Sequence, residues 1–212
     1  GLGLVLFLVF TTAFSQMEGT FSVFLVNRHL SAPAVELAGR WWEIEARIGP
    51  AVVREASLKA GYIFLAVGIV STVIQGLLIG RLRSRFGEPA LVITGCALLA
   101  ASLAAIPLAP GYGALFAPMV MLAAGAGLTN PSLSALVSLH APAGAQGEAL
   151  GAYQSMGALG RILGPALGGF FFSVGGASMP YAVASSMMVA ALVIAAVLRQ
   201  RVRAAPGATS AH

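Results

Sequence analysis

The chain has 212 residues, of which 58% are hydrophobic and 9% charged, and its formal net charge is +5. Soluble domains carry about 25% charged residues, so this composition excludes an ordinary water-soluble fold and indicates a membrane protein. The basic excess does not indicate a nucleic-acid partner, because the arginines flank apolar runs, where they set orientation in a bilayer.

Six apolar runs are long enough to cross a hydrocarbon core of roughly 30 Å, which needs about 20 helical residues. We expect an outer loop at residues 27–58 and a disordered cytoplasmic tail at residues 199–212. The predicted fold is an all-α membrane protein with six transmembrane helices. The expected spans are at about residues 2–26, 61–80, 89–109, 113–139, 148–174 and 180–198.

The first and fifth runs contain the two deeply placed charges, Glu18 and Arg161. A charge at the bilayer centre costs roughly 2.5–3.5 kcal/mol on insertion scales, so each is a functional candidate. At 1.5 Å per residue, the two lie about 24 Å and about 20 Å from the same membrane face. The functional hypothesis is that Glu18 and Arg161 form an ion pair or line one cavity, with Glu18 as a proton- or cation-responsive carboxylate. In the alternative, structural interpretation, Glu18 reaches the outer headgroups and Arg161 caps carbonyl groups.

The outer loop at residues 27–58 mixes charged residues with apolar ones that gather on one side at helical spacing. Tryptophan favours the headgroup region, so we expect an amphipathic helix on the outer membrane surface, broken near Pro50. The alternative is an external gate or a docking element. The apolar residues are Trp41, Trp42, Ile44, Ile48 and Val52.

Arginine density predicts the orientation. Basic residues at the ends of spans concentrate on the cytoplasmic side, and six spans place both termini there. We expect a bacterial inner membrane. The arginines that carry this prediction are Arg81, Arg83, Arg85, Arg199, Arg201 and Arg203.

The second run has small residues near one helix face, Gly68, Gly76 and Gly80, which allow close approach of a neighbour. It ends in the segment GRLRSRFGE, a tight basic turn whose arginines can pair with helix C-terminal carbonyls and lipid phosphates. An ordinary cytoplasmic loop would have a similar composition. The characteristic positions of the turn are Gly80, Arg81, Arg85 and Gly87.

The fifth run reads GAYQSMGALGRILGPALGGFFF. Gly160, Gly164 and Gly168 recur every four residues and form a stripe suited to close helix packing. Pro165 removes one backbone donor and predicts a kink, as at a moving joint. Gly151 and Gly169 complete the pattern.

With these two segments, the chain resembles the major facilitator superfamily, and most of all its drug/proton antiporter branch, which includes tetracycline exporters. The fifth run resembles the glycine-proline motif of that branch. Residues 80–88 resemble the loop between the second and third helices of each six-helix half. Ser84 stands where the amino-terminal copy of this loop usually has an acidic residue. The fourth run also lacks the arginine that marks the amino-terminal half of proton antiporters. The resemblance therefore implies the carboxyl-terminal half, whose partner is a missing amino-terminal six-helix half.

The resemblance further implies a proton-coupled efflux antiporter that carries a drug or another small lipophilic molecule by alternating access. It implies the proton gradient as energy source and no cofactor. Two alternatives stay open: a non-transporting membrane scaffold or regulatory half-transporter, and a metabolite carrier of the same superfamily.

Uncharged polar residues within the runs are further candidates for the transport pathway, because in lipid they need partners that a cavity can supply. Interhelical hydrogen bonds are the favoured interpretation over substrate contact. Asn130-Pro131 also predicts a break in the fourth run. These polar residues are Gln16, Gln75, Asn130, Tyr153 and Gln154.

The residues for enzymatic chemistry are missing from the sequence. An aspartyl intramembrane protease needs Asp, and the chain has none; a serine intramembrane protease needs a histidine within a span, and no run contains one. The single Cys96 excludes an internal disulfide, and no Cys/His cluster has metal-ligand spacing. We therefore expect neither an enzyme nor a metal site.

Overall fold

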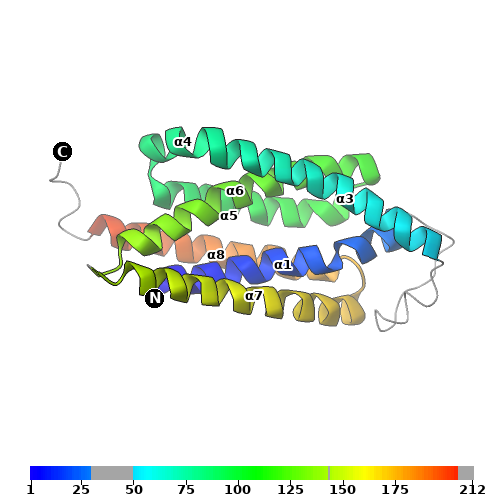
Figure 1. Cartoon of the computed structure of the whole chain (residues 1–212). Helices are drawn as coiled ribbons and strands as arrows, with labels where there is room; N and C mark the ends of the chain where they lie inside the picture. The colour runs from blue at the N-terminus through cyan, green and yellow to red at the C-terminus, as the bar shows by residue number, and fades with distance from the viewer. Residues whose placement is uncertain (30–49, 143, 205–212) are drawn as a thin grey trace.

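The computed structural model describes residues 1–29, 50–142 and 144–204, and within these ranges every regular element is helical. Six of these helices are long and apolar enough to cross a membrane. They lie side by side, and α1 begins at the end of the bundle where α8 finishes (Figure 1). The predicted all-α bundle of six transmembrane helices is confirmed.

One continuous helix forms the second span, Ala51–Phe86, although it contains a π-helical turn, η1, at Ile74–Leu78. Two 3-10 turns, η2 (Ile106–Leu108) and η3 (Tyr112–Leu115), lie between the third and fourth spans. The α-helices are α1 (Leu2–His29), α3 (Pro50–Val73), α4 (Ile79–Phe86), α5 (Glu88–Ala105), α6 (Phe116–Leu139), α7 (Gln146–Gly175) and α8 (Met179–Ala204).

Several helices run beyond their apolar segments. Pro50 begins α3, which fits the absence of its N–H, because the first helical turn leaves that group unbonded. Residues 50–58 are therefore helical and not part of an outer loop. Similarly, α8 continues to Ala204, so the predicted disordered tail does not begin at residue 199. Residues 30–49, with Trp41 and Trp42, and residues 205–212 lie outside the described residues.

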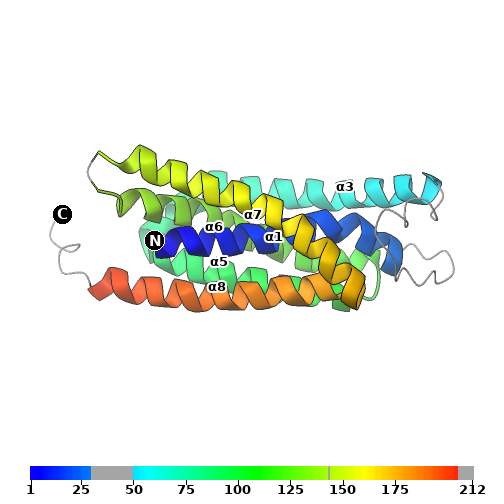
Figure 2. The same cartoon turned by 90° about the horizontal axis from the view of Figure 1, so that it is seen from below.

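Packing is uneven across the bundle. The most extensive contacts join α1 to α7 and α5 to α6, followed by α5 with α8 and α1 with α8. Figure 2 shows α1 between α7 and α8. In the second span only 11% of the most apolar segment is buried, against 50% for α1. The site described below is therefore positioned by the α1–α7 pair, while α3 and α4 leave a broad face open.

Candidate functional site

α1 and α7 run in the same direction and meet along a seam of small residues. Gly157 lies against Phe7, and Gly160 lies against Thr11 further along both helices. A Cβ atom on Gly164 would lie 2.7 Å from Ser15 Cβ, closer than real Cβ atoms approach. The structure thus places the glycine stripe of the fifth span at a contact where no larger residue fits.

Pro165 lies inside the continuous helix α7, and Figure 2 shows this helix changing direction along its length. Its ring faces α1, since a Cβ on Gly19 would lie 3.1 Å from Pro165 Cβ. Gly169 is half-buried beside this contact, whereas Gly151 is exposed with open space around it. Of the glycines in the motif, Gly151 alone takes no part in the joint between the two helices.

Glu18 and Arg161 lie on exposed faces of α1 and α7, next to the contact between the two helices. Both residues are exposed, Gly19 follows Glu18, and Pro165 lies one turn after Arg161. The contact between Gly19 and Pro165 brings these two surfaces together. Gln16 contacts Gly164 and Gly168 of α7, and it marks the side of this contact that faces α8, because its Nε2 donates a hydrogen bond of 2.7 Å to the carbonyl oxygen of Pro180. The two charges therefore share the side of the pair that faces away from α8.

The two charges do not form an ion pair within the described chain. The seam sets Arg161 level with Thr12, so Glu18 lies further along by about 9 Å at 1.5 Å per residue. Arg161 Nη1 is 3.4 Å from the place that a Cβ on Gly157 would occupy, so the guanidinium points back along α7, away from Glu18. Of the sequence hypotheses, a direct ion pair does not fit this geometry, and a shared cavity lining stays a prediction.

A cavity of about 330 Å³, the α1–α7 groove, opens between the two helices; Gly19, the residue after Glu18, lines it, whereas Glu18 and Arg161 do not. Its walls are apolar apart from one hydroxyl, so they suit an apolar ligand group. Sequence reasoning did not single out its residues, although Gly19, next to the deeply placed Glu18, was an available signal. The lining residues are Gly19, Thr20, Val23, Pro165, Ala166, Gly169 and Phe172.

Tyr153 and Asn130 are brought together by α7 and α6. The Tyr153 hydroxyl donates to Asn130 Oδ1 at 2.8 Å, and its ring stacks on Phe7 of α1 with 3.6 Å between centroids. This interhelical bond accounts for both polar groups without a substrate. α6 also continues through Pro131 as a helix, so the break predicted there is wrong.

Gln75 and Gln154 are exposed, and the described residues offer neither side chain a hydrogen bond. Gln75 lies in the π-helical turn η1, which the sequence analysis missed because such turns carry no composition signal. The rings of Phe21 and Phe64, 5.3 Å apart, fix the register between α1 and α3. In this register Gln75 lies close to the depth of Arg161.

The basic segment after the second span is helical rather than a loop, and only Gly87 has a turn conformation, with φ of 75°. Arg81 Nη1 donates to the Leu77 carbonyl at 3.4 Å, and Arg83 forms an ion pair of 2.5 Å with Glu88. Arg85 lies over the Phe86 ring, while Gly80 meets no neighbour within 4 Å. These residues form the end of α4 and contribute nothing to the groove.

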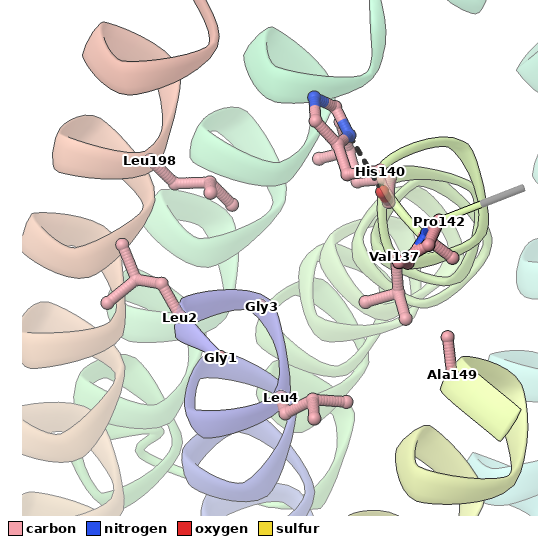
Figure 3. A pocket seen from close by; sticks show the side chains of 11 residues that line it. Gly1, Leu2, Gly3, Leu4, Val137, His140, Pro142, Ala149 and Leu198 are labelled. Atoms are coloured by element: carbon pink, nitrogen blue, oxygen red, sulfur yellow. Dashed lines mark hydrogen bonds between the residues drawn. The ribbon is translucent and has the colours of Figure 1, made fainter. Parts of the chain in front are cut away.

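A second cavity, of about 380 Å³, opens where α1 begins (Figure 3). Leu4, Val137 and Leu198 contribute apolar side chains to its lining. The one ionisable side chain is His140, whose Nδ1 lies 2.9 Å from the Leu136 carbonyl oxygen. None of the predicted site residues lines this cavity, so the groove with Glu18 and Arg161 remains the candidate site.

The fold and the groove define a multi-pass membrane protein with charged groups exposed on one face of its helices. The sequence profile of the Major Facilitator Superfamily matches residues 6–212, so the chain belongs to this family of membrane transporters and is not an enzyme. No match was found among curated proteins.

Among solved structures, the human organic anion transporter MFSD10 (TETRAN) is similar, with a TM-score of 0.73 and 22% sequence identity. The similarity covers 92% of this chain and 39% of that transporter. At this identity the likeness shows the fold: six helices arranged as in a part of a major facilitator transporter.

Proposed function

We propose that the chain is the carboxyl-terminal half of a proton-coupled antiporter that exports a drug or another small lipophilic molecule. It works with an amino-terminal six-helix half by alternating access, driven by the proton gradient across a bacterial cytoplasmic membrane, with both termini cytoplasmic. The observation that carries this proposal is the exposed carboxylate of Glu18 beside an apolar groove at the Pro165 joint.

A carboxylate at this depth is costly unless it meets a proton, a cation or a partner. Its ionisation depends on what fills the apolar groove beside it, because desolvation favours the protonated form. Substrate binding and proton binding can therefore compete at Glu18. The glycine seam and Pro165 support the moving part of the proposal, since α7 can bend against α1 where no side chains interlock.

The test is Glu18→Gln in the transporter that contains this chain, reconstituted in proteoliposomes. We expect transport driven by a pH gradient to be lost, while substrate exchange without a gradient persists, because only the proton-binding group is removed. Glu148→Gln is the matched control, since it makes the same chemical change at an exposed position at the start of α7. Unchanged gradient-driven transport in Glu18→Gln would overturn the proposed coupling.

The same experiment separates the alternatives. A metabolite carrier would exchange polar metabolites in preference to lipophilic probes. A scaffold or regulatory half-transporter would exchange neither, and no substrate would raise its thermal stability.

A further inference from the structure

We infer, resting on the proposed transport function, that the α1–α7 groove selects zwitterionic amphiphiles. Such molecules carry an ammonium group and a carboxylate separated by an apolar body. The inference starts from two opposite charges, Glu18 and Arg161, that are exposed on one face and make no ion pair within the described chain.

Charged side chains at membrane depth usually pair with one another or line a water-filled path. Glu18 and Arg161 do not satisfy each other, because they lie about 9 Å apart along the helix axes. The guanidinium also points toward Gly157, away from Glu18. Both charges therefore remain available to a third group, and a ligand with the reversed pattern of charge could engage both at once.

The surroundings of each charge match the ends of such a ligand. Arg161 presents a planar guanidinium, which suits a carboxylate because it can donate two parallel hydrogen bonds. Glu18 offers a carboxylate to an ammonium group next to Gly19, which lines the apolar cavity of about 330 Å³.

A set of three probes tests this inference: para-(aminomethyl)phenylpropanoic acid, its primary amide and its N-acetyl form. The acid is a zwitterion, the amide keeps only the positive charge, and the N-acetyl form keeps only the negative charge. Binding and exchange are measured without a pH gradient, so that a loss of proton coupling in a variant does not affect the result.

The wild-type transporter should prefer the zwitterion to either derivative by about tenfold, the size of one hydrogen bond to a charged group. Glu18→Gln should abolish the preference over the N-acetyl form and keep the preference over the amide. Arg161→Gln should abolish the preference over the amide and keep the preference over the N-acetyl form. Two control variants at exposed positions, Glu148→Gln and Ser155→Ala, should keep both preferences.

An equal change for all three probes in both variants leaves the preferences as in the wild type and would overturn the inference, because it would show that neither charge recognises one end of the probe. The proposed transport function would survive that result as long as exchange without a gradient persists. Equal handling of the three probes by the wild type would overturn the inference in the same way. A wild type that neither binds nor exchanges any probe, or any lipophilic drug, would overturn both.

Discussion

Two regions of this molecule contain glycine-rich spans, and they use their glycines in opposite ways. In α7 a Cβ on Gly160, Gly164 or Gly168 would come within 2.9 Å of an atom of α1. In the second span, Gly68 and Gly76 meet no neighbour within 4 Å. The α1–α7 pair is therefore held by close backbone contact, whereas α3 and α4 present their small residues to an open face. A small-residue pattern thus shows where helices can approach, and not whether a partner is present.

Gly164→Leu should have the largest effect, and it tests the contrast between the packed glycines of α7 and the open glycines of the second span. The new side chain would overlap Ser15 and the backbone of Gln16, so we expect a loss of stability of about 3 kcal/mol, at the upper end for overpacked sites. Thermal unfolding in detergent measures it. Gly68→Leu is the matched control and should change stability little, and a similar loss there would contradict the contrast.

A smaller effect is expected from Tyr153→Phe, which removes the hydroxyl that bonds Asn130 but keeps the ring on Phe7. Interhelical hydrogen bonds in membranes are worth about 0.6 kcal/mol on average, so a loss of about 1 kcal/mol or less should appear in unfolding. Ser186→Ala, which alters a bond within one exposed helix turn, serves as control. If Asn130→Ala added its full effect to that of Tyr153→Phe, the two residues would not be coupled.

Gly68→Ala should act in the opposite direction. With open space around it, an added methyl group costs nothing in packing, and alanine favours the helix by up to about 1 kcal/mol over glycine. A gain of a few tenths of a kcal/mol in the unfolding free energy is therefore expected for the isolated chain. A loss would show that a neighbour does pack against this face.

The smallest effect should come from Arg83→Gln at the end of α4. Its ion pair with Glu88 is partly exposed, with 48% of the arginine side chain accessible, so it contributes at most about 1 kcal/mol. Unfolding at low and high salt checks this, because the unfolding free energies of the wild type and the variant should converge as salt screens the ion pair. A loss that persists at high salt would indicate that Arg83 packs rather than pairs.

The six-helix fold was predictable because length and apolar content alone decide whether a helix can span a bilayer. The ends of the helices were less predictable: α3 begins at Pro50 and α4 ends at Phe86, since helix hydrogen bonding continues after hydropathy falls. The relation of Glu18 to Arg161 was predicted as a similar depth with either an ion pair or a shared cavity lining, and the described residues show no ion pair. Counting from each helix end cannot give the relative shift of two helices, nor the direction in which a long arginine side chain lies.

The π-helical turn in the second span divides that helix into two parts, which differ in their hydrogen bonds to neighbouring segments and in the burial of their side chains. On one side, the Tyr112 hydroxyl donates to the Lys59 carbonyl at 2.9 Å, and Ser71 donates to the Ala123 carbonyl at 3.3 Å. On the other side, from Ile74 to Phe86, no side chain is buried. A rotation of the part from Ile74 to Phe86 about the π-helical turn would break neither of these two hydrogen bonds. The part from Ile74 to Phe86 is connected instead to α5, through Gly87 and through the ion pair between Arg83 and Glu88.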